Sequence, residues 1–173
     1  PLPAFEAGAH VDIHLKTGLV RQYSLCGDPA NAGAYRLGVL KDPASRGGSV
    51  AVHELLQEGR EIEISLPRNH FPLASDAKRS ILIGGGIGIT PMVAMAYALN
   101  ARDSDFDLHY CGRSRSRSAF LAELGNAAFA ARLHTHFDDE APEQKLDLGK
   151  VLGTPQAGVH VYVCGPAGFM DWV

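Results

Sequence analysis

Cysteine is scarce in this sequence, and its three cysteines lie far apart. Cys26, Cys111 and Cys164 form neither a CxxC pair nor a C-x4-C-x2-C run, so local spacing builds no zinc site and no iron–sulfur cluster. Isolated reduced thiols are typical of a cytoplasmic protein, and we expect that compartment. His134 and His136 would face the same side of a strand, but a histidine pair without a nearby cysteine or carboxylate indicates packing or surface rather than metal.

Long apolar runs and an excess of positive charge are also missing. No run approaches the roughly 20 residues that a membrane-spanning helix needs, and the formal net charge of -3 gives no basic surface for nucleic acid. Hydrophobic residues make up 46% and charged residues 20% of the 173 positions, which is ordinary for a globular protein. We therefore expect one or two folded domains with neither a nucleic-acid nor a membrane partner.

Hydrophobic periodicity changes along the chain. Residues 1–75 contain short alternating segments such as "VDIHL", separated by turn residues, which predicts antiparallel strands. From residue 76 onward, apolar strands alternate with helical spacing, which predicts a parallel sheet with helices on both faces. The expected fold is a small antiparallel Greek-key barrel over residues 1–75, followed by a doubly wound parallel-sheet domain over residues 76–173. Strands are expected at 11–15, 19–25, 35–40, 61–66, 80–85, 106–112, 132–137 and 159–165, and helices within 47–59, 91–102 and 118–131.

Two expected strands of the second half end in glycine-bearing turns. "GGGIGITPM" joins a strand to a helix at residues 84–92, and "CGP" follows the last strand at residues 164–166. A doubly wound sheet binds nucleotides at the carboxyl ends of its strands, where glycines let the backbone approach a pyrophosphate. The first loop is not a P-loop, because Thr90 and Pro91 stand where lysine and serine or threonine are needed. Taken alone, each loop is equally well explained by a structural role, and Cys164 is equally well explained as a small buried hydrophobic residue. Two glycine-bearing strand ends that face one crevice favour a nucleotide site.

Two further segments carry arginine, serine and glycine. "CGRSRSRSAF" places Arg113, Arg115 and Arg117 just past a strand, where such arginines either bind the ribose 2′-phosphate of NADP or form a solvated loop. "RGGS", at residues 46–49, opens the expected short helix and suits an anion, although Ser49 alone is equally interpreted as an N-cap. With Arg21 on a separate strand, a shared phosphate site is a coherent hypothesis.

These motifs together resemble those of a known superfamily. "RQYS", at residues 21–24, resembles the RxYS flavin motif of the ferredoxin–NADP reductase superfamily, residues 84–92 its GGxGxTPM nucleotide loop, and residues 164–170 its CGPxxFM segment. "PASRGGSVAVH" and "ISLPRNHFPL" are similar, more narrowly, to the phthalate dioxygenase reductase and vanillate demethylase reductase group. That group implies FMN rather than FAD, NADH or NADPH as the electron donor, and a C-terminal plant-type [2Fe–2S] domain as the acceptor.

The resemblance implies a role for each matching residue. Arg21 contacts the FMN phosphate, Tyr23 lies along the flavin, and the Ser24 hydroxyl points at the flavin N5 atom. Thr90 and Cys164 lie near the nicotinamide and the flavin, so the expected catalytic residues are Ser24, Thr90 and Cys164. The other expected cofactor-binding residues line the phosphate cradle, the ring edge and the nucleotide loops: Gln22, Gly38, Val39, Leu40, Gly47, Gly48, Ser49, Gly85, Gly86, Gly88, Pro91, Arg113, Ser114, Arg117, Gly165 and Pro166.

The implied reaction is hydride transfer from C4 of NAD(P)H to N5 of FMN, with electrons passing on to the iron–sulfur domain and an oxygenase component. Compared with the family pattern, the sequence starts about one strand late and stops inside a helix, so we expect an incomplete core without the iron–sulfur domain. Two alternatives stay open. One is an FAD-dependent ferredoxin or flavohaemoglobin-type reductase, and the other is a nucleotide-binding or partner-docking module without redox activity.

Overall fold

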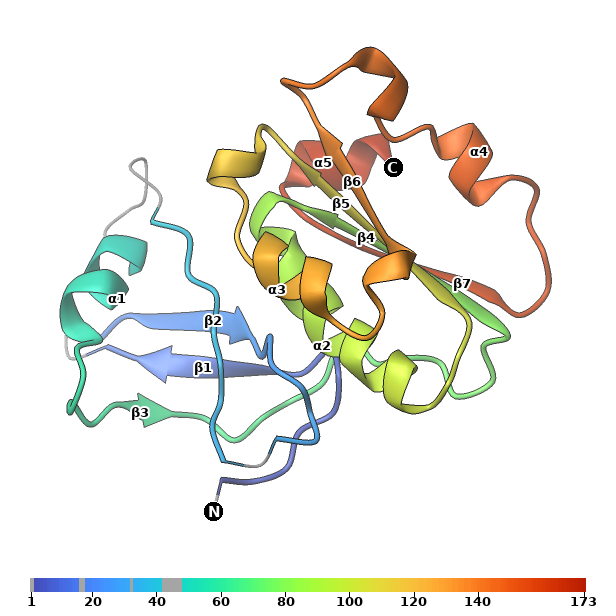
Figure 1. Cartoon of the computed structure of the whole chain (residues 1–173). Coiled ribbons are helices and arrows are strands. Elements are labelled where there is room, and N and C mark those ends of the chain that lie inside the picture. The colour runs from blue at the N-terminus through green and yellow to red at the C-terminus, as the bar shows by residue number, and fades with distance from the viewer. Residues whose placement is uncertain (1, 16–17, 32, 42–47) are drawn as a thin grey trace.

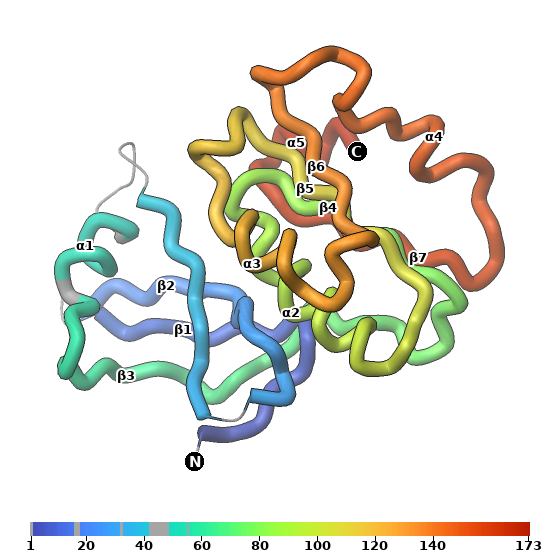
Figure 2. Tube along the Cα trace, in the orientation of Figure 1, coloured from blue at the N-terminus to red at the C-terminus, as the bar shows by residue number. Residues whose placement is uncertain are grey.

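Two sheets of different construction lie side by side in the molecule (Figure 1). The computed structural model describes the chain except residues 1, 16–17, 32 and 42–47. An antiparallel half contains β1 to β3 and α1, and a parallel half runs from β4 to α5. The N-terminus lies in the first half and the C-terminus in the second, as the trace in Figure 2 shows. This arrangement confirms the predicted two-domain β plus α/β fold.

The antiparallel sheet has the strand order β2-β1-β3. Its elements are β1 (His10–His14), β2 (Val20–Ser24) and β3 (Glu63–Ile64), with helix α1 (Gly48–Leu55) between β2 and β3. Val11 and Ile13 on β1 are 1% and 0% exposed, because alternate residues of a strand face the same side and these face the hydrophobic interior. The predicted alternation of residues 11–15 is therefore confirmed.

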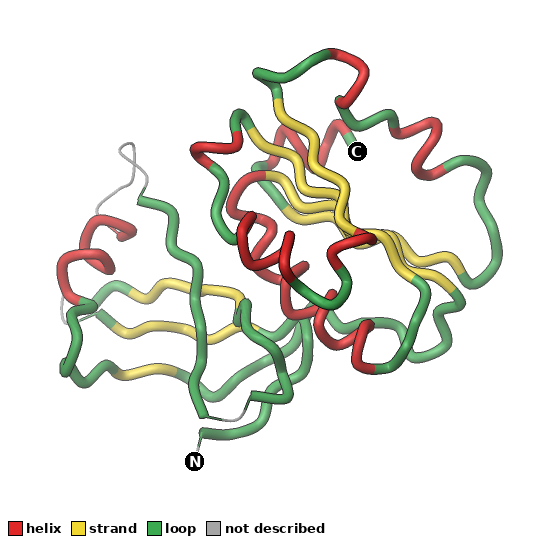
Figure 3. The backbone as a smooth tube through the Cα atoms, viewed as in Figure 1, coloured by secondary structure: helices red, strands yellow, loops and turns green. Residues whose placement is uncertain are grey.

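Regular pairing in this half is shorter than the sequence predicts. Residues 35–40 do not form a strand and pair only through the isolated bridge between Leu25 and Leu37. The predicted strand 61–66 reduces to β3, because the Ser65 hydroxyl accepts the backbone N–H of Asp12 at 2.9 Å. Only one backbone bond joins these two residues, from the Ser65 N–H to the Asp12 carbonyl oxygen at 2.9 Å, and the regular ladder gives way to the isolated bridge between His10 and Arg68. Figure 3 shows how much of this half is loop.

The parallel sheet has the strand order β6-β5-β4-β7. Its strands are β4 (Arg79–Gly85), β5 (Phe106–Gly112), β6 (Leu133–Phe137) and β7 (Val159–Cys164), all paired in parallel. The chain runs outward from β4 through β5 to β6 and then returns to the other side of β4 to form β7. The point where the order reverses, between β4 and β7, is where open sheets of this kind bind ligands. The helices are α2 (Ile89–Ala101), α3 (Leu121–Asn126), α4 (Leu148–Leu152) and α5 (Ala167–Trp172), with 3-10 turns at Gly86–Gly88, Arg115–Arg117, Ala130–Arg132 and Pro142–Gln144.

Helices cover both faces of the parallel sheet. Leu82 belongs to a core cluster with residues of α2 and α3, whereas Ile81 and Ile83 belong to a second cluster with residues of α4 and α5. A strand buried on both faces carries a continuous apolar run, which explains the "SILIGG" segment. The predicted helix 91–102 is confirmed as α2. The predicted helix 118–131 is too long, because the chain becomes extended at Ala127 (φ -69°, ψ 156°).

The two halves share one hydrophobic core. The cluster around α2 includes Ala7 and Cys26 from the antiparallel half together with Met92 and Tyr110 from the parallel half. The two sheets are therefore held in one arrangement by buried apolar contact. Among the helices of the described residues, none has the length and apolar character needed to cross a bilayer.

Candidate functional site

The glycine loops after β4 and β7 meet at the point where the strand order reverses. A Cβ atom on Gly88 would lie 2.2 Å from the carbonyl oxygen of Cys164 and 2.6 Å from the nitrogen of Gly165. Only glycine allows two backbones to approach this closely. The sequence prediction that two glycine-bearing strand ends face one crevice is thus consistent with the position of both loops.

The first turn of α2 follows the first of these glycine loops directly. Thr90 is 6% exposed, and its hydroxyl donates to the carbonyl oxygen of Ile87 at 3.0 Å. Pro91 follows it and is buried, in a position where a missing backbone N–H costs nothing. Burial raises the pKa of the Cys164 thiol at the end of β7, so this group is a neutral thiol rather than a thiolate nucleophile at neutral pH.

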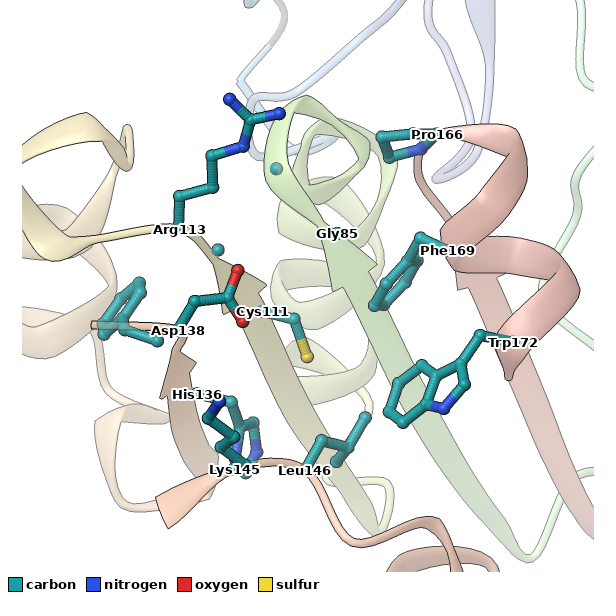
Figure 4. Close-up of a pocket in the computed structure, with 13 residues that line it drawn as sticks. Gly85, Cys111, Arg113, His136, Asp138, Lys145, Leu146, Pro166, Phe169 and Trp172 are labelled. Carbon is teal, nitrogen blue, oxygen red and sulfur yellow. The ribbon is translucent and has the colours of Figure 1, made fainter. Parts of the chain in front are cut away.

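A pocket of about 440 Å³ opens at the carboxyl edge of the sheet (Figure 4). Four predicted residues line it: Gly85, Gly86, Arg113 and Pro166. Sequence reasoning missed its other walls, although five of them lie at or just after the carboxyl ends of β5 and β6, which is the signal that would have found those five. Those walls are Cys111, Gly112, His136, Phe137, Asp138, Lys145, Leu146, Phe169 and Trp172.

The arginine cluster does not act as one group. Arg113 faces the pocket, whereas Arg115 pairs with Glu140 at 2.5 Å and lies over the Phe137 ring, 4.9 Å from its centroid. Arg117 is exposed and is not among the pocket-lining residues, and the Ser114 hydroxyl lies 3.2 Å from that of Ser116. Of the predicted 2′-phosphate contacts, the pocket therefore includes Arg113 but not Ser114 or Arg117.

Three imidazole rings lie together on β5 and β6, and one of them, His136, lines the pocket. The His109 ring stacks on those of His134 and His136, with centroids 4.8 and 5.3 Å away. His136 Nδ1 lies 2.6 Å from the carbonyl oxygen of Gln144, so that nitrogen must carry the proton, and His136 Nε2 accepts from His109 Nδ1 at 3.0 Å. This chain of hydrogen bonds fixes the segment that supplies Lys145 and Leu146 to the pocket. The prediction that His134 and His136 face the same side is confirmed, and His109 was missed.

The residues of the "RQYS" motif lie on β2. Arg21 is half-buried, and its guanidinium donates to the carbonyl oxygen of Val20 at 2.9 Å. Tyr23 is half-buried against the cluster of Ile13, and burial raises the pKa of its hydroxyl. Ser24, at the end of β2, pairs with His10, and Gln22 is exposed.

The remaining predicted flavin residues lie in the segment before α1 and at its start. A Cβ atom on Gly38 would lie 2.6 Å from the Thr90 methyl carbon. The segment predicted to line the edge of the flavin ring therefore contacts the first turn of α2, which is predicted to lie near the nicotinamide. The carbonyl oxygen of Val39 lies 3.0 Å from His53 Nε2, and Leu40 is 57% exposed. Helix α1 begins at Gly48, which places Ser49 inside its first turn. Gly47 lies outside the described residues.

Comparison with known proteins identifies the class of this fold and site. Residues 82–173 match the model of the oxidoreductase NAD-binding domain family, so the chain belongs to that family of oxidoreductases. The chain is also similar to vanillate O-demethylase oxidoreductase and to phthalate dioxygenase reductase, which confirms the resemblance seen in the sequence.

The individual matches extend over nearly the whole chain. Vanillate O-demethylase oxidoreductase of Pseudomonas putida is 57% identical over 98% of this chain and 53% of its own length. Phthalate dioxygenase reductase of Burkholderia cepacia is 41% identical over 100% of this chain and 54% of its own length. A solved structure of phthalate dioxygenase reductase superposes with a TM-score of 0.92 at 40% identity, covering 99% of this chain and 54% of that one. The chain thus spans about half the length of the curated relatives that it matches.

Proposed function

We propose that the chain binds FMN and a pyridine nucleotide and transfers hydride from C4 of the nicotinamide to N5 of the flavin. The observation that carries this proposal is the contact between the two halves at Gly38 and Thr90, where an added Cβ atom would lie 2.6 Å from the threonine methyl. A segment expected to line the flavin and a helix expected to line the nicotinamide meet at that point. Hydride transfer requires this adjacency, because the two reacting atoms must come within about 3–3.5 Å.

The residues present fit both cofactors. The close approach of Gly88 to Cys164 leaves backbone rather than side chains at the nucleotide loop, which suits a pyrophosphate. The Arg21 guanidinium carries several N–H donors, and its Nη1 atom donates to the neighbouring Val20 carbonyl oxygen. Its other donors can contact a phosphate bidentately. We expect Arg21 to hold the one phosphate of FMN, and this expectation rests on the match to the RxYS motif.

The protein's own residues position the two rings, and the cofactors supply the hydride chemistry when they are bound. Ser24, at the end of β2, would supply a hydroxyl donor for the flavin N5 atom. The Thr90 hydroxyl is already bonded to Ile87, so the threonine presents its methyl group to the interface. Cys164 provides an uncharged wall, because burial raises its thiol pKa. Together these groups orient the rings and exclude water.

The pocket favours NADH over NADPH. Asp138 lines it beside Arg113, and a carboxylate repels a 2′-phosphate. Arg115 is already paired with Glu140. The variant Arg113→Ala should therefore weaken NADH and NADPH use by similar factors, whereas a selective loss of NADPH use in Arg113→Ala or Arg117→Ala would assign these arginines to the 2′-phosphate.

The electron acceptor is inferred from the relatives. The solved phthalate dioxygenase reductase is described as a modular structure for electron transfer from pyridine nucleotides to [2Fe-2S]. Several other relatives are named as parts of demethylase, dioxygenase or monooxygenase systems. We propose that a [2Fe–2S] domain receives electrons from the reduced flavin and delivers them to an oxygenase that acts on an aromatic compound.

An anaerobic titration tests the proposal. The purified chain is mixed with FMN or with FAD, NADH or NADPH is added, and the flavin absorbance is followed. The expected result is that FMN is bleached by one of the two nucleotides. If a nucleotide bleaches FAD but not FMN, the flavohaemoglobin-type alternative is favoured. A folded chain that binds nucleotide but no flavin would overturn the proposal in favour of a nucleotide-binding module.

A further inference from the structure

A partly buried ion pair joins the two halves next to the proposed site. Arg36, in the antiparallel half, donates to both carboxylate oxygens of Glu123 on α3, at 2.7 and 2.8 Å. The Tyr97 hydroxyl on α2 donates to the same carboxylate at 2.8 Å. We call Arg36, Glu123 and Tyr97 the interface cluster. It connects three segments that local sequence patterns do not relate, since Arg36 and Glu123 are 87 positions apart.

Arg36 is itself held on its own side of the interface. Its Nε atom donates to the carbonyl oxygen of Cys26 at 3.1 Å, and the Cys26 amide donates back to the Arg36 carbonyl oxygen at 2.9 Å. The guanidinium also lies over the Phe120 ring, 5.2 Å from its centroid. A planar guanidinium held by two carboxylate bonds and a ring face has a defined orientation. The cluster therefore fixes the relative position of the segments that it joins, in addition to balancing their charges.

The cluster and the proposed site use the same segments. Gly38 follows Arg36 by two residues, and a Cβ atom on Gly38 would lie 3.3 Å from the Phe120 ring and 2.6 Å from the Thr90 methyl. Phe120 precedes α3 with a left-handed φ of 64°, and Thr90 lies in the first turn of the helix that carries Tyr97. The contact between flavin segment and nucleotide helix therefore lies beside the cluster.

The charges of the cluster are well matched. The Arg36 and Glu123 side chains are 40% and 29% exposed. Burial alone would raise the pKa of Glu123, but hydrogen bonds from Arg36 and Tyr97 outweigh it and lower that pKa. The bond to Glu123 in turn raises the pKa of Arg36. Both groups thus remain charged at neutral pH, and the pair persists under the conditions of turnover.

We infer that Arg36 and Glu123 are positioning residues, which set the distance between the Gly38 segment and the first turn of α2 and so the stacking of nicotinamide on flavin. This inference rests on the proposed function. Because the shared hydrophobic core already holds the halves together, loss of the ion pair should disturb the fine geometry rather than the fold. A displacement on the order of 1 Å is enough to slow a positioned reaction strongly.

The variant Arg36→Met tests the inference, with Arg132→Met as its matched control. Arg132 makes the same three kinds of contact inside the parallel half: an ion pair with Asp105 at 3.0 Å, a bond to a backbone carbonyl, and a ring face of Phe106 at 5.0 Å. The first readout needs no cofactor. Hydrogen exchange at the amides of Cys26 and Leu124 should accelerate at least about 10-fold in Arg36→Met and stay unchanged in Arg132→Met.

The second readout is the reaction itself. At saturating nucleotide, flavin reduction should slow about 10-fold and the long-wavelength charge-transfer absorbance of the stacked rings should fall, while the flavin Kd changes less than about 2-fold. Glu123→Gln should behave like Arg36→Met, and the double variant should be no worse than either, because both remove one interaction.

Each outcome decides a separate point. Faster exchange with normal flavin reduction, or unchanged exchange, would overturn the positioning role. Equal effects in Arg36→Met and Arg132→Met would assign the loss to general destabilisation and also overturn it. If the parent chain binds no flavin, the proposed function fails, and hydrogen exchange still reports whether the cluster holds the two segments together.

Discussion

Acidification should destabilise this protein through His109. The imidazole is 6% exposed, and burial, followed by the charges that His134 and His136 can acquire, lowers its pKa from 6.5 to about 4. The charge of Asp107 raises the His109 pKa, and the charge of Arg79 lowers it, as the histidine charges do. Because the folded pKa lies below the unfolded one, the stabilisation is fully present above about pH 6.5 and is lost as the pH falls towards 4.

The magnitude follows from the two pKa values. Each pH unit between them costs about 1.4 kcal/mol, because the unfolded chain binds a proton there and the folded chain does not. Between about pH 8 and pH 5, His109 alone should therefore lower the free energy of unfolding by about 2 kcal/mol. That is a large part of the roughly 5–15 kcal/mol by which domains are stable.

Urea unfolding at a series of pH values, compared between the parent chain and His109→Asn, isolates this contribution. The asparagine amide keeps a donor near His136 Nε2, removes the titrating ring, and loses packing by an amount that does not depend on pH. The difference in unfolding free energy between the two chains should shrink by about 2 kcal/mol from about pH 8 to pH 5.

A constant difference between the two chains across that range would refute the reasoning. A direct control is the NMR titration of the His109 ring in the His134→Asn variant. There the His109 pKa should rise, because one neighbouring charge is removed, but stay below 6.5, because burial is the largest cause of the shift.

Three other predictions follow from the site. Gly88→Ala should lower stability by about 1–3 kcal/mol and weaken nucleotide binding, because its Cβ would lie 2.2 Å from the Cys164 carbonyl oxygen; the control Gly125→Ala, with nothing within 4 Å, should do neither. Arg21→Ala should weaken FMN binding about 10- to 100-fold by loss of a charged hydrogen bond, and unchanged retention on gel filtration would contradict this. Ser24→Ala should slow flavin reduction in stopped flow with little change in FMN affinity.

The parallel half was predictable because its signals are local. Residues 81–83 of β4 are all apolar because both faces of the strand are buried, and glycine is required at Gly88 by its close approach to Cys164. In the antiparallel half, the alternation of β1 was equally plain. The short length of its partner 61–66 was not, because the regular ladder is interrupted where the Ser65 hydroxyl accepts the Asp12 N–H, and these residues are 53 positions apart.

The pocket walls were harder to predict for a related reason. Lys145 and Leu146 belong to a segment whose position depends on the bond from His136 to Gln144 and, through His136, on His109 in another strand. The arginine cluster shows the same limit. Its three arginines look equivalent in the sequence. In the structure Arg115 forms an ion pair with Glu140, which follows a different strand, and so it does not line the pocket.

The reacting geometry belongs to the interface rather than to either sheet. The proposed flavin residues lie on the antiparallel half and the proposed nicotinamide residues on the parallel half, so the distance between the rings depends on how the halves meet. The shared core that joins Ala7 and Cys26 to Met92 is apolar and non-directional, and it sets the orientation only coarsely. The directional bonds of Arg36 to Glu123 refine it. Substitutions at this interface should therefore change the rate of hydride transfer while leaving the affinity for each cofactor nearly intact, the opposite of what Arg21→Ala should do.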